Sequence, residues 1–551
     1  MKQQLSVENQ FVLKNHLTWI GGLLVLTLLV YWKAFYNGFT NWDDEPYVTE
    51  NFLIRELNWQ TVKYWLTAFH HGNYHPITML TYVLDYHFAK LNPLWYHVEN
   101  VIFHLFNTFL VYVVIWKLFR HKITAIVSAF IFALHPMHVE SVAWISERKD
   151  VLFTFFYFLG LNAYLNYIET SGKKQLVWVY VFFLLSLLSK PAAITFCLVL
   201  PLVDYWKGRG FTKPVILEKI PFFIISFIFG IIAIKAQMAA EAIADAQVFT
   251  VWQRIMFASY AVLMYLYKFF VPVNQANFHP YPTLDAQGNI PFIFYVAPFL
   301  FLILTTGVLF FHKKSRTLVF GYLFFFFNLI LVLQLVSVGN AIIAERYTYV
   351  PYVGLAAVLG EGLVFIEQNR KKWFKPVVFL AAVWGMFLIY RTYQQIDTWK
   401  DALSLWNNQL KVYPDDVFGH NKRGTYLAIN KKYKEALKDF QWIAKYYPNN
   451  EKALLGIANI YGQLGQPQKA LEYYNRILKI NPNTFEARVN RAITYSMLKQ
   501  YDKALEDYAV AEQIKPEDLK IYINRSYTYL ETKQYAKAVE DYNRVLQVDK
   551  N

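Results

Sequence analysis

The feature that most constrains this chain is a series of long apolar runs, all within its first 400 residues. A helix needs about 20 predominantly apolar residues to cross a bilayer. Eleven runs reach or approach this length: 17–35, 96–116, 123–139, 151–168, 175–189, 191–206, 220–238, 291–311, 318–338, 342–365 and 376–391. The sequence therefore predicts an all-α, polytopic membrane domain with about eleven spans.

The distribution of charge divides the chain into two unlike parts. Of the last 151 residues, 41 are Lys, Arg, Asp or Glu, whereas only 52 of the 400 before them are. Since about a quarter of the residues in soluble domains are charged, we expect a membrane domain over 1–392 and a soluble one over 393–551. The single cysteine, Cys197, excludes an intrachain disulfide. The net charge of +15 forms no basic stripe, which argues against a nucleic-acid partner.

The soluble part is an array of repeats. A proline, an alanine, an aromatic and a small residue each recur every 34 residues, which is the period of the tetratricopeptide repeat (TPR), a pair of packed helices. The positions are Pro414, Pro448, Pro482 and Pro516; Ala436, Ala470, Ala504 and Ala538; Phe440, Tyr474, Tyr508 and Tyr542; Gly424, Ala458, Ala492 and Ser526. The pattern predicts a TPR α-solenoid of about four repeats, preceded by a half repeat over 393–413. Such solenoids bind peptides or proteins, and a rigid spacer is the alternative.

Basic residues in the short loops predict the orientation of the spans. A cytoplasmic N-terminus and eleven crossings place five basic clusters inside and the C-terminal repeats outside, on the same side as the first loop, 36–95. A shorter run, 256–271, is predicted to be re-entrant or interfacial, because a twelfth crossing would move the last two clusters outside. The clusters are Lys117/Arg120/Lys122, Lys173/Lys174, Lys207/Arg209/Lys213, Lys313/Lys314/Arg316 and Arg370/Lys371/Lys372/Lys375.

An acidic pair opens the first outer loop. Asp43 and Asp44 follow Asn41 and Trp42 directly after the first span. Adjacent carboxylates raise each other's pKa, so one of them could act as the general base for an acceptor hydroxyl. Binding a divalent cation and capping a juxtamembrane helix are the alternatives.

Polar residues also lie at the outer end of the 123–139 run. His135, His138 and Glu140 have the residue types of a metal site, but Pro136 interrupts the helix that would bring them together. Histidines satisfied by local hydrogen bonds are therefore favoured over a metal site.

Four charged residues follow at 147–150. Arg148 and Lys149 could hold a phosphate, for which guanidinium is well suited. Ion pairs with Glu147 and Asp150 are the alternative.

Two further cations lie at predicted outer turns. Lys190, in Ser189–Lys190–Pro191, could snorkel to the interface or neutralise a lipid phosphate. Glu345 and Arg346 begin the 342–365 run, where helix N-terminal N–H groups and Arg346 would suit an anion; an internal Glu–Arg pair is the alternative. Carboxylates and four cations, Arg148, Lys149, Lys190 and Arg346, are thus predicted on one face of the membrane domain. This suits a donor with a lipid tail and a phosphate better than it suits a transporter, which would carry mid-membrane charges.

These motifs, in this order, resemble those of the polytopic GT-C glycosyltransferases. With C-terminal TPRs, the chain looks most like the transmembrane and tetratricopeptide repeat-containing protein O-mannosyltransferases and their bacterial relatives. The resemblance implies transfer of a sugar, typically mannose, from a polyprenyl-phosphate donor to Ser/Thr of a protein, with inversion and without an obligatory metal or cofactor. It further implies that Asp43 or Asp44 is the base, that Arg148, Lys190 and Arg346 neutralise the leaving phosphate, and that the TPRs receive the acceptor.

Two other functions are compatible with the same sequence. One is a polysaccharide ligase or polymerase that uses a lipid-linked donor, and the other is a non-catalytic TPR scaffold in the membrane. The composition is typical of a bacterium, which would place the repeats outside the cytoplasmic membrane. In a eukaryote the same topology would place them in the lumen of the endoplasmic reticulum.

Overall fold

The chain folds into two compact, almost entirely helical units, Met1–Asn408 and Gln409–Asn551. The computed structural model describes residues 2–240, 249–285, 287–335, 339 and 341–548. The prediction of an all-α fold is confirmed. The boundary between the units lies later in the chain than the predicted one at residue 392.

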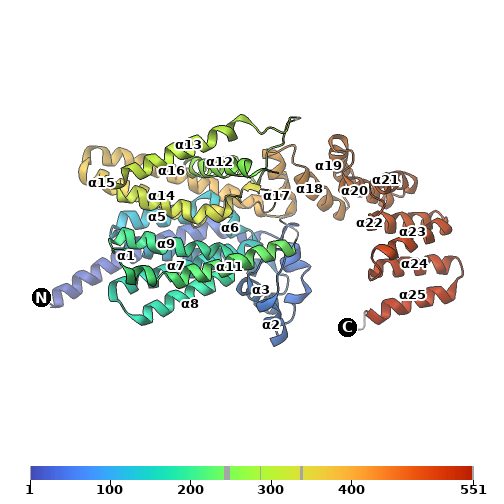
Figure 1. Cartoon of the computed structure of the whole chain (residues 1–551), viewed down its shortest axis with the longest axis horizontal. Coiled ribbons are helices and arrows are strands. Elements are labelled where there is room, and N and C mark those ends of the chain that lie inside the picture. The colour runs from blue at the N-terminus through green and yellow to red at the C-terminus, as the bar shows by residue number, and fades with distance from the viewer. Residues whose placement is uncertain (1, 241–248, 286, 336–338, 340, 549–551) are drawn as a thin grey trace. The chain divides into compact units, whose positions relative to one another are not determined.

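The first unit is a bundle of helices that lie side by side, with α2 and α3 at one end (Figure 1). Two short strands, β1 (His279–Pro280) and β2 (Ala341–Ile343), pair antiparallel. The helices are α1 (Lys2–Tyr31), α2 (Trp59–Thr67), α3 (Pro76–Ala89), α4 (Pro93–Phe119), α5 (Lys122–Leu134), α6 (Val139–Ala143), α7 (Arg148–Thr170), α8 (Lys173–Ser189), α9 (Phe196–Lys207), α10 (Lys213–Leu217), α11 (Ile220–Ala239), α12 (Val251–Phe270), α13 (Phe292–Phe310), α14 (Arg316–Leu329), α15 (Tyr352–Asn369), α16 (Lys371–Gln395) and α17 (Ala402–Val412).

Six helical segments among the described residues are long and apolar enough to cross a membrane, which makes this a multi-pass membrane protein. The segments are His16–Tyr36, Pro93–Phe119, Ile145–Thr170, Lys213–Ala239, Phe292–Lys313 and Lys371–Trp399. A seventh is the bent pair Lys122–Leu134 and Pro136–Ala143, whose halves meet at 55°. The eleven predicted spans are therefore not confirmed. Of the other predicted runs, 318–338 ends outside the described residues, and 256–271 lies in one continuous helix, α12, which is not among the six.

Prolines break the helices where the polar motifs lie. Pro136 separates α5 from α6, and Pro191 follows the end of α8. Because the residue before a proline is restricted to extended conformations, Lys190 has φ −157° and ψ 132° and leaves the helix axis. The breaks convert apolar helices into short turns that can carry charged side chains.

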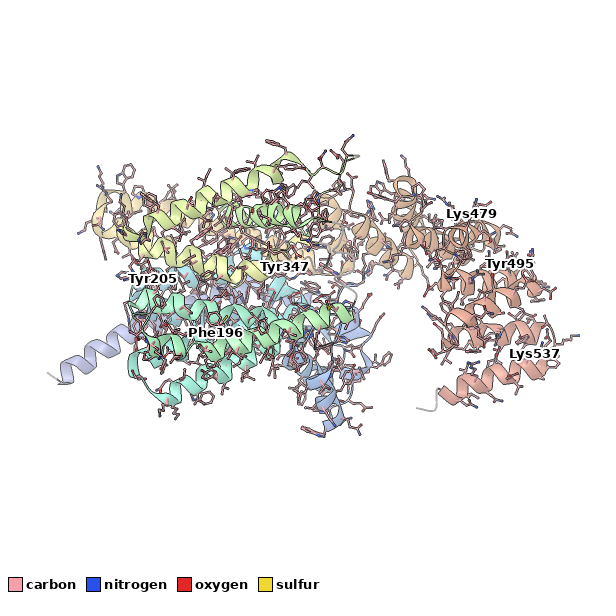
Figure 2. The ribbon with its side chains drawn as sticks, viewed as in Figure 1. Phe196, Tyr205, Tyr347, Lys479, Tyr495 and Lys537 are labelled. Carbon is pink, nitrogen blue, oxygen red and sulfur yellow. The ribbon has the colours of Figure 1, made fainter. Side chains whose placement is uncertain are left out.

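The two ends of the first unit differ in character. Three predicted inner clusters meet at one end, where Lys207 Nζ donates to the carbonyl of Lys117 (2.6 Å) and Arg316 donates to the carbonyl of Tyr205. Tyr205 lies toward this end, whereas Tyr347, beside the predicted outer residues, lies toward the end that carries α2 and α3 (Figure 2). Three of the five predicted inner clusters therefore lie away from Tyr347 (Figure 2); the orientation of the spans stays a prediction.

The second unit contains four pairs of antiparallel helices, and each pair falls on one predicted TPR. The aromatic ring of Phe440 explains the small residue at Gly424: a Cβ atom added there would lie 3.0 Å from that ring, and one added at Gly456 would lie 2.7 Å from it. All four recurring alanines are buried. The helices are α18 (Val417–Ile429), α19 (Tyr433–Tyr446), α20 (Glu451–Gln463), α21 (Pro467–Ile480), α22 (Phe485–Met497), α23 (Tyr501–Ile514), α24 (Leu519–Glu531) and α25 (Tyr535–Val548).

The predicted half repeat over 393–413 belongs largely to the first unit. Its aromatic residues pack there: the ring of Trp399 stacks on that of Trp144 (5.0 Å between centroids), and Trp406 packs against Trp42. These residues extend the membrane unit by a belt of tryptophans.

Candidate functional site

The adjacent carboxylates Asp43 and Asp44 have different environments. Asp44 is 1% exposed and accepts four hydrogen bonds: from N–H (2.8 Å) and Oγ1 (2.9 Å) of Thr40, and from N–H (3.0 Å) and Oγ of Ser146. Burial raises the pKa of Asp44, and these hydrogen bonds oppose the rise. Asp44 therefore ties the loop that follows the first span to the turn before α7. The predicted capping role is not realised, since its side chain makes no cap hydrogen bond to the turn at Glu45–Thr49.

Asp43 is the more accessible of the two carboxylates. Its side chain is 23% exposed, and its oxygens lie 3.9 Å from Lys149 Nζ and 3.9 Å from His71 Nε2. The neighbouring Trp42 fixes the loop by stacking on Trp144, with 4.6 Å between ring centroids. The backbone of Asp43 is thus held in place, while its carboxylate contacts the neighbouring charged groups only at 3.9 Å. The lone pairs of this carboxylate are therefore available for a ligand.

Three cations converge on one buried carboxylate, Glu147. Its oxygens lie 3.2 Å from Lys149 Nζ, 3.2 Å from Lys190 Nζ and 3.3 Å from Arg346 Nε. Lys190 also binds Asp150 Oδ1 at 2.5 Å. Burial alone would lower the pKa of Lys190, but Asp150 and Glu147 hold it above its usual value. The structure thus brings together Lys149, Lys190 and Arg346. The carboxylate of Glu147 lies between these three cations.

Arg346 is bound on its other side by Glu140. The backbone N–H of Arg346 donates to Glu140 Oε2 (2.9 Å), and its guanidinium pairs with Oε1 of the same carboxylate. The prediction that free helix N-terminal N–H groups bind an anion here is wrong, because Glu345–Thr348 form a short 3-10 turn and α15 starts only at Tyr352. The guanidinium, rather than the helix end, is the group that faces the cluster.

Arg148 was predicted to join this cluster, and the structure contradicts that prediction. Its side chain is fully buried and pairs with Asp85 (2.9 Å) and Glu99 (2.5 Å), away from Glu147. It also donates to Asn100 and to the carbonyl of Tyr96. With its donors occupied, Arg148 braces α3 and α4 against α7 and has none left for a phosphate.

The remaining predicted residues support the surrounding structure. His135 Nε2 donates to the carbonyl of Phe269 (3.0 Å), and His138 Nδ1 donates to that of Phe132 (2.8 Å). Asn41 accepts a hydrogen bond from Trp406 Nε1 (2.6 Å), and Glu345 accepts one from the N–H of Ala276 (3.1 Å). The two histidines are thus used in packing. Within the described ranges, no group of three or more His, Cys, Asp or Glu side chains could hold a metal ion; that no metal is required stays a prediction.

One segment near the cluster was missed by sequence reasoning, residues 70–75. His71 lies beside Asp43, and His75 is 3% exposed, with neither ring nitrogen hydrogen-bonded among the described residues. Burial, followed by the charge of Lys149, lowers the pKa of His75 well below its usual range. The His-His-Gly-Asn sequence at 70–73 is a turn signal that could have indicated the segment.

A groove of about 330 Å³ adjoins the cluster. It opens beside Lys190 and is lined on another side by α11, a candidate membrane span. The groove therefore combines a cation of the cluster with an apolar wall. Its lining includes Asn73, Tyr74, Lys190, Tyr347, Gly230, Ala233, Ile234 and Leu331.

Comparisons with known proteins concern both the repeats and the chain as a whole. The tetratricopeptide repeat family matches residues 451–484, 473–506 and 519–551. The human protein O-mannosyl-transferase TMTC3 is 23% identical over 494 residues, which cover 80% of this chain and 53% of that protein. The protein O-mannosyl-transferase F38B6.6 of Caenorhabditis elegans is 26% identical over 391 residues, 69% of this chain and 55% of the relative.

The chain is a homologue of the TMTC protein O-mannosyl-transferases. The resemblance expected from its motifs is thereby confirmed. This TMTC homologue spans about half the length of the curated relatives it matches. Among solved structures, a crystal structure of MamA is 19% identical, with a TM-score of 0.25, and covers 27% of this chain and 87% of the MamA chain.

Proposed function

We propose that this protein transfers a hexose, such as mannose, from a polyprenyl-phosphate donor to Ser or Thr hydroxyls of an extracytoplasmic protein. The observation that carries the proposal is the juxtaposition of an accessible carboxylate, Asp43, with the three cations around Glu147. One of these cations, Lys190, also lines the groove whose apolar wall is α11. A phosphate near Lys190 and a lipid tail along α11 would match both parts of that groove. The names of the homologues support the same class of reaction.

In the proposed reaction, the acceptor oxygen attacks the anomeric carbon of the sugar. Asp43 takes the proton of the hydroxyl, the bond from the anomeric carbon to the phosphate oxygen breaks, and attack from the opposite face inverts the configuration. Lys149, Lys190 and Arg346 stabilise the negative charge that develops on the departing polyprenyl phosphate. This stabilisation is strong in a site that is largely buried, because little water competes for the charge. We propose no role for a metal or cofactor.

The TPR unit is proposed to bind the acceptor protein, since helical repeats commonly present an extended surface to a partner. We further propose eleven crossings with the N-terminus in the cytoplasm and the repeats outside. A reporter enzyme that is active only outside the cytoplasm, fused after Asn551, is expected to be active. Activity of the complementary cytoplasmic reporter at the same position would contradict this topology.

Mass spectrometry of cell-envelope proteins provides the test of the proposed activity. We expect hexose-modified Ser/Thr peptides in cells that express the protein, and their loss when the gene is deleted. Re-expression of the wild-type chain is expected to restore the modification, whereas equal amounts of the Asp43→Asn variant should not. Altered surface polysaccharide with unchanged protein glycosylation would instead support a polysaccharide ligase. Unchanged glycans of both kinds would support a membrane scaffold.

A further inference from the structure

A tight turn presents His71 to the accessible carboxylate. His70 and Asn73 exchange two backbone hydrogen bonds, each 2.9 Å long, across the turn. The two central residues, His71 and Gly72, have positive φ angles of 47° and 75°. Two central residues with positive φ define the type I′ hairpin turn. Glycine adopts this conformation freely, but for the side-chain-bearing His71 it is uncommon.

Contacts on three sides hold this turn in place. His70 Nε2 donates to the carbonyl of Pro46 (2.8 Å), and Asn73 Nδ2 donates to Tyr47 Oη (3.0 Å). Gly72 packs so closely against Gln237 of α11 that an added Cβ atom would lie 3.3 Å from it. Backbone strain that the surroundings maintain is concentrated at functional sites. The side chain so positioned is that of His71, which packs edge-on against the ring of Tyr47 and is 54% exposed; its imidazole makes no hydrogen bond to any described residue.

Asp43 is itself 23% exposed, and His71 is the more exposed of its two near neighbours. Its Nε2 lies 3.9 Å from Asp43 Oδ1, while the other near neighbour of Asp43, Lys149, is 7% exposed and already paired with Glu147. We propose that His71 is a proton relay, which accepts from Asp43 the proton taken from the acceptor hydroxyl and releases it to water. This inference rests on the proposed transfer reaction and adds to it the exit route of the proton.

The relay restores the site after each transfer. Asp43 gains one proton when the new glycosidic bond forms, and it must lose that proton before it can act as a base again. A small movement brings Nε2 of neutral His71 within hydrogen-bond distance of protonated Asp43, and the imidazolium then loses a proton from its ring to solvent. Imidazole suits this task because it titrates near neutral pH. The charged and titratable groups that face His71 are Asp43, Lys149 behind it, His70 in the same turn, and Tyr47.

The pH profile of transfer tests the relay in the full-length protein in lipid nanodiscs, with a synthetic polyprenyl-phosphate hexose and a peptide acceptor. Since asparagine also tolerates positive φ, His71→Asn should keep the turn and the melting temperature. We expect kcat at neutral pH to fall at least 10-fold with little change in KM. We also expect the rate of the variant to depend less on pH near neutrality than the rate of the wild type, because the variant has no imidazole to accept the proton. An unchanged kcat, or an unchanged pH profile, would overturn the relay.

Chemical rescue provides a second readout. Glycine fits the turn without strain and leaves space beside Asp43, so His71→Gly is expected to regain rate as imidazole is added to the buffer. The His71→Asn variant, whose side chain fills that space, is the matched control and should not respond. An equal response of both variants, or of neither, would contradict the relay.

The relay and the proposed function fail in different ways. If no donor supports transfer by the wild-type chain, the proposed function fails. If the wild type transfers sugar and His71→Asn keeps its kcat, the relay is excluded while the proposed function stands.

Discussion

Asp43→Asn is expected to abolish sugar transfer while leaving the fold intact. Loss of a general base typically lowers the rate by about 10²–10⁴-fold. Folding should be unaffected because, among the described residues, the Asp43 side chain makes only two charged contacts, both at 3.9 Å, and nearly a quarter of its surface is exposed. The amide has the same shape but cannot accept the proton of the acceptor hydroxyl. We expect the effect in kcat, with the melting temperature within about a degree of the wild type.

The adjacent residue provides a matched control with the opposite expected result. Asp44→Asn replaces one of two acceptor oxygens by an NH₂ group, which must then face a backbone N–H, either that of Thr40 or that of Ser146. A buried donor without an acceptor costs about 1–3 kcal/mol. Asp44→Asn should therefore lower the melting temperature, and any loss of transfer should follow the loss of folded protein.

Purified variants in nanodiscs allow both quantities to be measured on the same sample, by thermal unfolding and by transfer per folded molecule. If Asp43→Asn keeps wild-type kcat, the general-base role of Asp43 is wrong. If Asp44→Asn instead abolishes transfer at unchanged stability, the roles of the two carboxylates are reversed.

The sequence could predict which segments carry the site, but not which direction each side chain takes. Charged residues at breaks in apolar helices are few, so Asp43, Glu147, Lys190 and Arg346 stand out. Consecutive residues at the start of a helix point about 100° apart. Arg148 and Lys149 consequently pair with different carboxylates. The partners of Arg148, Asp85 and Glu99, are far from it in sequence. No local pattern could assign them.

The repeats were predicted more completely than the membrane unit. A 34-residue period predicts both helices of each repeat, because it marks residues that pack against one another, as Phe440 does against Gly424. Apolar runs determine less of the structure than this period does. A run such as 191–206 reads as one span, yet in the structure a 3-10 turn at Pro191–Thr195 precedes α9, which has only 12 residues. Hydropathy does not distinguish these two arrangements.

The cations around Glu147 give the second large expected effect. Lys190→Met should lower kcat by about 10²–10³-fold, the typical loss when one group that stabilises developing negative charge is removed. The same substitution leaves Asp150 and Glu147, 3% and 2% exposed, without one of their cations. Breaking a buried pair by removal of one partner costs about 3–5 kcal/mol, so the single variant alone does not separate catalysis from stability.

The double variant Lys190→Met/Asp150→Asn separates them. It removes the charge of both members of the 2.5 Å pair, and the asparagine can still accept the hydrogen bond that Ser141 Oγ donates to Asp150 (3.0 Å). Replacing both partners of a buried ion pair by neutral groups is often close to neutral for stability, so the melting temperature should recover most of its loss. Transfer should not recover, because the positive charge beside the groove is still absent.

Lys174→Ala, at an exposed lysine in the first turn of α8, is the control for loss of a positive charge elsewhere and should have wild-type kcat. Recovery of transfer together with stability in the double variant would show that Lys190 serves the fold alone. Failure of Lys190→Arg to retain more activity than Lys190→Met would also contradict a charge-based role.

With Glu147 at the centre of the three cations, a donor phosphate must share these cations with its carboxylate or displace it. Glu147→Gln should therefore tighten donor binding, measured as a lower KM, even though it weakens the pairing that holds Lys149 and Arg346 in place.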